Sequence, residues 1–224
     1  MKKIHSTIIF FIGFLSCVLF FYLKIINYGI IPLLISKLMP SVLMCLWLIG
    51  NKNNNNKNWP ILLTGLVCSF FCDLFMELPD NSFQLFGILS NMVGLLFYIL
   101  FFTQSCKQRN LFDLLPITII IMSVFSVIAP NTHEMFIPVF IYCIFFIIFM
   151  WRSTTRIKDP DITTLSKQIC VVGSICIVCS DSLLSFQMFS ILNKSFVYVV
   201  VIMMLWWIGL LLLTVTAGTK EKIA

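Results

Sequence analysis

Eight long runs of apolar residues, separated by short polar breaks, account for most of the chain. The runs lie at roughly residues 6–26, 30–50, 59–79, 82–104, 111–129, 134–151, 165–190 and 195–218. Each has about the 20-residue length that a helix needs to cross a bilayer, and none alternates as a barrel strand does. Because backbone polar groups in lipid must be hydrogen-bonded internally, such runs form helices. The pattern predicts an all-α integral membrane protein, a bundle of about eight transmembrane helices in a single domain over residues 1–224.

The composition excludes a soluble protein and argues against a nucleic-acid partner. Hydrophobic residues make up 60% of the chain and charged residues 11%, which is too much apolar surface for a soluble domain to cover. The net charge of +6 comes from basic residues in short loops, so it forms no nucleic-acid surface. Nearly all of the nine cysteines fall inside the apolar runs, where small buried side chains are expected. We expect no disulfide framework, no metal and no cofactor.

Lysine and arginine are distributed unevenly between the two sides that eight spans define. Lys24 and Lys37 fall within or at the edge of runs, and the other side's loops receive only Lys194. The basic side receives Lys2, Lys3, Lys52, Lys57, Lys107, Arg109, Arg152, Arg156, Lys158, Lys167, Lys220 and Lys222. The positive-inside rule therefore predicts that both termini are cytoplasmic. We interpret the first run as an uncleaved helix, because no small-residue cleavage site follows it. A bacterial inner membrane is the expected location, with an endoplasmic reticulum membrane left open.

Three charged residues, Lys37, Asp73 and Asp181, lie well inside the apolar runs. From the helical rise, they lie about 10, 9 and 13 Å from the outer ends of their helices. Charges at such depth are costly and face a cavity or a partner. Their common level predicts one polar cavity in the outer half of the bilayer. The alternative is three separately satisfied charges, or a structural Lys–Asp pair.

Other polar side chains share the faces or helices of these charges, and we expect them to bind a substrate together with Lys37. Each of them is equally explained by a hydrogen bond between helices. The candidates for substrate binding are Lys37, Ser69, Asn91, Tyr98, Tyr142 and Ser182.

Four further residues have other expected roles. Glu77 lies four residues after Asp73 and is close enough to a helix end to reach the membrane surface, and Asp113 suits the N-terminus of a helix dipole. Trp206 and Trp207 lie in the middle of a run, where packing in the core is the expected role and the lining of an apolar pocket is the alternative.

A weak internal similarity links the third and seventh runs. A glycine, a cysteine and an aspartate recur at the same offsets, as Gly65, Cys68 and Asp73 and again as Gly173, Cys176 and Asp181. A parallel repeat of four plus four helices is one interpretation of this similarity.

Several stretches resemble one known family of membrane proteins. They are "SKLMP" (36–40), "GLVCSFFCDLFM" (65–76), "FGILSNMVGLLFYILFF" (86–102), "IPVFIYCIFFIIFM" (137–150) and "GSICIVCSDSLLSFQMF" (173–189). In this order they resemble the YhhN-like lysoplasmalogenase family, and "SDSLL" is the most specific of them. The resemblance implies hydrolysis of the vinyl ether bond of lysoplasmalogens to a fatty aldehyde and glycerophosphoethanolamine or glycerophosphocholine.

The same resemblance assigns roles to particular residues. It implies that Asp73 and Asp181 are the catalytic pair and that Lys37 matches the family's lysine of the second helix. The chain departs from the family's pattern at three positions. Cys72 stands where a glycine is usual, Leu95 aligns with a usual histidine, and Gly209 lies near a usual glutamine.

Vinyl ether hydrolysis suits two intramembrane carboxyl groups. One acid protonates the β-carbon, and a second carboxylate stabilises the resulting cation and orients water, as the carboxylate pair of a glycosidase does. We expect Asp181 to be the acid and Asp73 the base or ion stabiliser, with the reverse assignment open. The expected ligands are a lysophospholipid and membrane lipid. A non-enzymatic lipid-binding protein or a small proton-coupled transporter is the alternative, since buried charges serve those functions as well.

Overall fold

The computed structural model describes residues 2–52, 57–79, 81–106, 111–160, 162–193 and 195–218. Within these residues the chain forms eight α-helices and no strand, and every helix is long and apolar enough to cross a membrane. The predicted all-α membrane architecture is therefore confirmed. The basic residues Lys107, Arg109, Lys194, Lys220 and Lys222 lie outside the described residues.

The helices begin and end close to the bounds expected from the apolar runs. They are α1 (Lys2–Ile25), α2 (Ile30–Gly50), α3 (Trp59–Glu77), α4 (Asn81–Ser105), α5 (Leu114–Ile128), α6 (Phe136–Thr155), α7 (Thr164–Met188) and α8 (Phe196–Gly218). Single 3₁₀ turns flank α5 and α6 at Leu111–Asp113, Ala129–Asn131, His133–Met135 and Arg156–Lys158. The largest differences from the expected bounds are at the start of α1, which begins four residues before 6, and at the end of α6, which continues four residues beyond 151.

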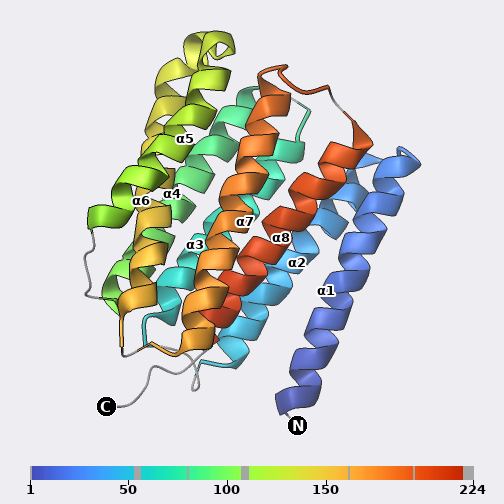
Figure 1. Cartoon of the computed structure of the whole chain (residues 1–224). Helices are drawn as coiled ribbons and strands as arrows, with labels where there is room; N and C mark the ends of the chain where they lie inside the picture. The colour runs from blue at the N-terminus through green and yellow to red at the C-terminus, as the bar shows by residue number, and fades with distance from the viewer. Residues whose placement is uncertain are drawn as a thin grey trace.

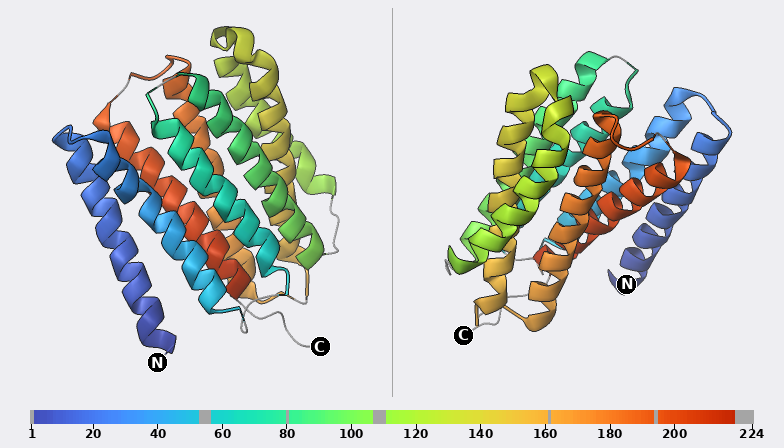
Figure 2. Two further views of the ribbon diagram at one scale, coloured as in Figure 1. Left: turned by 180° about the vertical axis from the view of Figure 1, so that it is seen from behind. Right: turned by 45° about the horizontal axis from the view of Figure 1, so that its top comes forward.

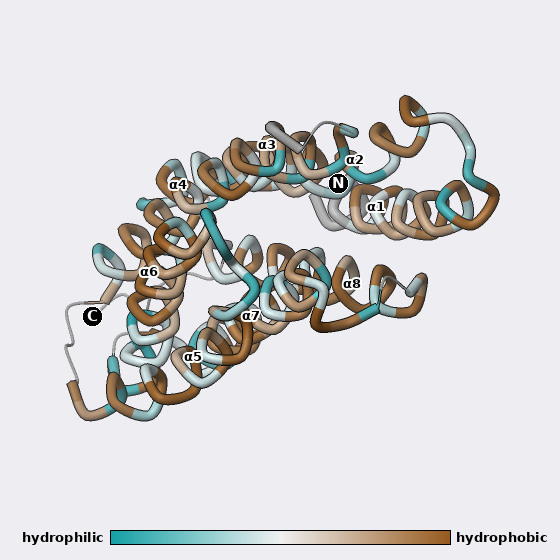
Figure 3. The backbone as a smooth tube through the Cα atoms, turned by 90° about the horizontal axis from the view of Figure 1, so that it is seen from above, coloured by the Kyte–Doolittle hydropathy of each residue, from teal (hydrophilic) through white to brown (hydrophobic). Residues whose placement is uncertain are grey.

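The helices pack as two facing rows. Seen along the bundle in Figure 3, α2, α3 and α4 form one row and α8, α7 and α5 the other, with α6 closing one end. The outermost helix, α1, lies against α2 at the other end (Figure 1 and Figure 2). The start of α1 and the end of α8 lie at the same end of the bundle (Figure 1). Which side of the membrane this end faces stays a prediction.

Glycines bring two pairs of helices into backbone contact. A Cβ at Gly94 of α4 would lie 3.3 Å from the carbonyl oxygen of Gly65 in α3. A Cβ at Gly173 of α7 would lie 3.1 Å from the carbonyl oxygen of Gly209 in α8. Small residues permit such close approach of membrane helices, where packing rather than the hydrophobic effect drives association. As a result, α3–α4 and α7–α8 are the two most closely packed helix pairs.

Two arginines explain why α6 extends past the apolar run. We expected Arg152 and Arg156 to lie in a basic loop, but their side chains are only 3% and 2% exposed. The Arg152 guanidinium donates to the carbonyl oxygen of Cys106 (2.7 Å) and to Thr103 Oγ1 (3.1 Å), and Arg156 donates to Ser105 Oγ. These bonds satisfy polar groups at the C-terminal end of α4, which a helix leaves without internal partners. The same hydrogen bonds hold the last turn of α6 against the C-terminal end of α4.

Candidate active site

A cavity of about 220 Å³ lies between the two rows, towards the end of the bundle where α1, α3 and α7 finish. Seven of the eight helices contribute to its lining, and α5 is the exception. Most of the lining side chains are apolar, and both intramembrane aspartates are among the polar ones. A mainly apolar cavity with a few converging polar groups is the usual form of a small-molecule site.

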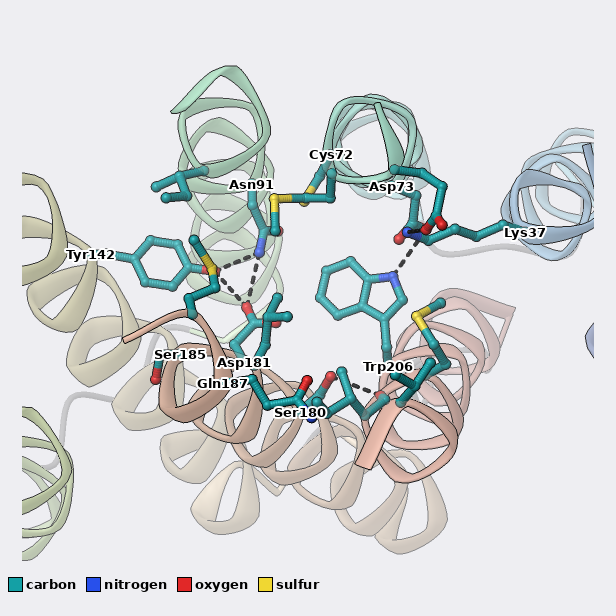
Figure 4. A pocket seen from close by; sticks show the side chains of 18 of the residues that line it. Lys37, Cys72, Asp73, Asn91, Tyr142, Ser180, Asp181, Ser185, Gln187 and Trp206 are labelled. Carbon is teal, nitrogen blue, oxygen red and sulfur yellow. Dashed lines mark hydrogen bonds and ion pairs between the residues drawn. The ribbon is translucent and has the colours of Figure 1, made fainter. Parts of the chain in front are cut away.

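Asp181 projects from α7 into a pair of hydrogen-bond donors (Figure 4). Its Oδ2 accepts from the Tyr142 hydroxyl of α6 at 2.5 Å and from the Asn91 amide of α4 at 2.9 Å. The Asn91 amide and the Tyr142 hydroxyl also lie 2.5 Å apart. The three side chains therefore form a closed triangle that joins three helices. Asn91 and Tyr142, both expected to bind a substrate, line the cavity beside Asp181.

Asp73 has a different partner, which the sequence did not indicate. The indole Nε1 of Trp206 donates to Asp73 Oδ2 at 3.0 Å, and both side chains are buried. We expected Trp206 to pack in the core, but its indole lines the cavity, and in Figure 4 it lies between Asp73 and Asp181. No hydrogen bond joins the two carboxyl groups within the described residues. The two carboxyl groups line the same cavity, but each accepts hydrogen bonds from different side chains.

Glu77 is a member of the site. Its Oε2 accepts from Lys37 Nζ at 2.9 Å, and its Oε1 accepts from Lys24 Nζ at 2.6 Å. The expected contact of Lys37 was with an aspartate or a substrate phosphate, but its direct ion pair is with Glu77. Lys37 also interacts electrostatically with Asp73 over a longer distance. The three charges join α1, α2 and α3 at the end of the cavity nearest the membrane surface.

Three expected substrate-binding residues lie elsewhere. Ser69 and Tyr98 are fully buried and hydrogen-bonded to each other at 2.8 Å across α3 and α4. The hydroxyl of Ser182 donates to the carbonyl oxygen of Val178 in its own helix. None of the three lines the cavity. Helical spacing places Ser69 on the same face as Asp73, and Tyr98 on the same face as Asn91. Side chains on one helix face can contact either the cavity or a neighbouring helix, and these two contact each other between α3 and α4.

Gln187 is a further cavity residue that the sequence analysis missed. It lies in the last turn of α7 and is only 8% exposed. Its Nε2 atom is buried and has no hydrogen-bond partner within the described part of the chain. Buried polar groups are normally paired, so an unpaired donor at a cavity wall indicates a place where a ligand can accept a hydrogen bond.

Within the described residues, no group of three or more His, Cys, Asp or Glu side chains is arranged to hold a metal ion. The carboxyl groups of Asp73 and Asp181 bind neighbouring side chains instead. The charged side chains that line this cavity are those of three carboxylic acids and two lysines, in mainly apolar surroundings.

Comparison with protein families gives one match, to the model of the YhhN family over residues 33–217. The chain belongs to the YhhN family. No curated protein and no solved structure matches it. The matched residues of this YhhN-family chain include both aspartates, Glu77, Gln187 and Trp206. They exclude the whole of α1, and with it Lys24.

The packing accounts for two departures from the pattern of the YhhN family. Leu95 is fully buried in the hydrophobic core and does not line the cavity, so a histidine aligned there would not face Asp73 or Asp181. Gly209 lies against α7, where an added Cβ would be 2.6 Å from Cγ1 of Ile177. A glutamine at this position is incompatible with the close approach of α7 and α8.

Proposed function

We propose that this YhhN-family protein is a lysoplasmalogenase-like hydrolase, which cleaves the vinyl ether bond of a lysoplasmalogen to give a fatty aldehyde and a glycerophospho-alcohol. The observation that carries the proposal is one intramembrane cavity lined by two carboxyl groups with separate supports, Asp181 with Tyr142 and Asn91, and Asp73 with Trp206. The membership in the family supports the same reaction class.

The proposed reaction begins with proton transfer from a carboxylic acid to the β-carbon of the vinyl ether. The double bond supplies the electron pair for the new C–H bond, and an oxocarbenium ion forms at the α-carbon. Water adds to that carbon and gives up a proton, which leaves a hemiacetal. The hemiacetal then loses its hydroxyl proton, forms the C=O bond and breaks its bond to the glycerol oxygen, which takes a proton. The proton given up by the water restores the carboxylic acid. One water is consumed, and an aldehyde and a free hydroxyl are formed.

We assign the role of acid to Asp181. The hydrogen-bond partners of its carboxyl group are neutral, and they leave room for a proton on Oδ1 facing the cavity. When Asp181 releases this proton, the Tyr142 hydroxyl and the Asn91 amide stabilise the carboxylate that appears. Donors aimed in advance at a developing charge are among the strongest contributions to catalysis.

We assign the role of ion stabiliser and base to Asp73. The N–H of Trp206 donates to this carboxyl group, and the positive charge of Lys37 interacts with it electrostatically. An ionised Asp73 would stabilise the oxocarbenium ion and accept a proton from the attacking water. Low-dielectric surroundings strengthen this interaction, because the surrounding side chains screen charge less than water does.

Replacement of each aspartate tests the proposal. Purified D73N and D181N proteins are expected to release no measurable aldehyde from a lysoplasmalogen, while the wild type does. Asp113→Asn is the matched control, because Asp113 lies outside the cavity and pairs with Lys158. Full activity of either cavity variant would overturn the mechanism. Absence of turnover by the wild type across several head groups would favour the lipid-binding or transport alternative.

A further inference from the structure

We propose that Lys24 and Gln187 bind the phosphate of a single-chain phospholipid at the mouth of the cavity, and that Lys24 reaches it by leaving Glu77. This inference rests on the proposed function for the identity of the ligand, but the anion site itself is testable without turnover. Lys24 lies outside the residues that the family model matches, whereas Glu77 and Gln187 lie within them.

The residues concerned come from three helix ends on the same side of the bundle. Lys24 lies in the last turn of α1, Glu77 is the last residue of α3, and Gln187 lies in the last turn of α7. In Figure 1 these three ends lie together, opposite the start of α1. All three residues line the cavity. They form its polar end, where a lipid head group would meet the membrane surface.

The charges at this end are unequal. Lys24 and Lys37 contribute two positive charges and Glu77 one negative charge. The ionised Asp73 proposed above lies deeper on α3 and interacts with Lys37, so Lys37 has two carboxylate partners and Lys24 shares only Glu77. A phosphodiester carries a single negative charge and would give Lys24 a partner that Lys37 does not share. Phosphate oxygens form charge-assisted hydrogen bonds with an ammonium group, so such an anion would be bound favourably.

Only one of the two lysines is free to change its partner. The Lys37 side chain is 6% exposed and is held against Glu77 beneath the surface. The Lys24 side chain is 36% exposed, and its long aliphatic stem allows the ammonium group to move along the membrane interface. Glu77 would keep Lys37 as its partner after Lys24 moves, so no charge would be left unpaired.

Gln187 supplies the second, independent indication of a ligand. Its buried Nε2 has no partner within the described residues, and a phosphate or glycerol oxygen is an acceptor that would pair with it. The Gln187 amide lies on α7, on the other row of helices from Glu77. A ligand that binds both Lys24 and Gln187 would therefore bridge the mouth of the cavity.

The depth of the aspartates agrees with a phosphate held at this level. Asp73 lies four residues below Glu77 on α3, and Asp181 lies six residues below Gln187 on α7. These separations correspond to roughly 6 and 9 Å along the helices. About seven covalent bonds, on the order of 8 Å, separate the phosphorus of a lysoplasmalogen from its β-carbon. A phosphate bound at the mouth would thus place the vinyl ether between the two carboxyl groups.

Kinetics with two substrates test this site. The substrates are a 1-alkenyl-glycerophosphoethanolamine and the phosphate-free 1-alkenylglycerol. In K24Q and Q187L, the preference for the phosphate-bearing substrate, measured as the ratio of the two KM values, is expected to fall about tenfold. K24R is expected to keep most of the preference, because arginine also binds phosphate. Lys57→Gln is the matched control, since this exposed lysine precedes α3 at the opposite end of the bundle.

Binding of a saturated 1-alkyl-glycerophosphoethanolamine, which has no vinyl ether to hydrolyse, separates this inference from the proposed function. Calorimetry in detergent is expected to give a Kd about tenfold higher for K24Q than for the wild type, and no change for K57Q. Inorganic phosphate alone is expected not to compete, because the tail must occupy the cavity. Equal Kd values for K24Q and the wild type would overturn the site even if the enzyme is active. A tenfold difference without any aldehyde release would uphold the site and overturn the proposed reaction.

Discussion

The hydroxyl of Tyr142 lies 2.5 Å from Oδ2 of Asp181. The Asn91 amide donates to the same oxygen, so two donors from two other helices converge on one atom of this carboxyl group. Within the described residues, neither donates to Oδ1. This arrangement fixes the orientation of Asp181 in the cavity wall and leaves its second oxygen without a donor from these two side chains, which suits a proton donor.

Removing the Tyr142 hydroxyl tests this arrangement. We expect Tyr142→Phe to lower kcat about tenfold, because one hydrogen bond to the carboxylate formed at Asp181 contributes about 1–2 kcal/mol. Tyr98→Phe is the matched control, since the Tyr98 hydroxyl also makes a hydrogen bond, but to Ser69 outside the cavity. The measurement is aldehyde release by both purified variants. Equal losses in the two variants would show that the effect is general and not specific to Asp181.

The adjacent tryptophans of α8 provide a second contrast. Trp206→Phe removes the N–H donor to Asp73 and keeps an aromatic ring, so kcat is expected to fall about tenfold or more. Trp207→Phe should leave kcat unchanged, because the Trp207 Nε1 has no hydrogen-bond partner in the described residues and its ring packs on Phe20 and Phe21. A loss of kcat in W207F as large as in W206F would contradict the assigned role of the Asp73 contact.

The close approach of α7 and α8 predicts a loss of stability on adding one methyl group. In Gly173→Ala the new Cβ would lie 2.9 Å from Leu212 Cβ and 3.1 Å from the Gly209 carbonyl oxygen, so the helices must separate. We expect the free energy of unfolding to fall by about 1–3 kcal/mol, the range for overpacking. Gly50→Ala, with nothing within 4 Å of its Cβ, should be neutral or slightly stabilising. Thermal unfolding in detergent compares them, and unchanged stability of G173A would refute a tight contact.

Orientation in the membrane is a separate prediction. The distribution of lysine and arginine places both termini in the cytoplasm, which would open the cavity towards the outer leaflet. A C-terminal green fluorescent protein fusion should therefore fluoresce in a bacterial host, and a C-terminal alkaline phosphatase fusion should be inactive. An active phosphatase fusion with a dark fluorescent one would reverse the orientation and place the cavity mouth at the inner leaflet.

The sequence allowed the helices and the two carboxyl groups to be predicted, because both depend on local properties. A run of about 20 apolar residues defines a span by its length, and Asp73 and Asp181 are conspicuous inside such runs. The partners of these residues could not be predicted. In the sequence, Trp206 is indistinguishable from an aromatic residue of the core, because its contact with Asp73 depends on how α3 and α8 pack. Gln187 resembles an ordinary polar residue at the end of a helix.

The same limit explains two residues whose surroundings differ from those expected. Ser69 shares a helix face with Asp73, but it turns to Tyr98 across the tight α3–α4 contact. Glu77 was expected to reach the membrane surface, yet two lysines from α1 and α2 hold it in place. Helical spacing gives the direction of a side chain to within one face. Which neighbour lies in that direction depends on how the helices pack.

The glycine contacts distinguish tightly packed helix pairs, where substitutions are costly, from the cavity between them, where substitutions are better tolerated. Asp73 belongs to the α3–α4 pair and Asp181 to the α7–α8 pair, and in each pair backbones touch. Neither carboxyl group can shift relative to its own pair, so their separation is set only by how the two pairs face each other. Side chains that line the cavity between the two pairs, such as Leu184 and Met203, lie away from the glycine contacts that hold each pair together. Variation there would alter which lipid chains fit while the reacting groups stay in place.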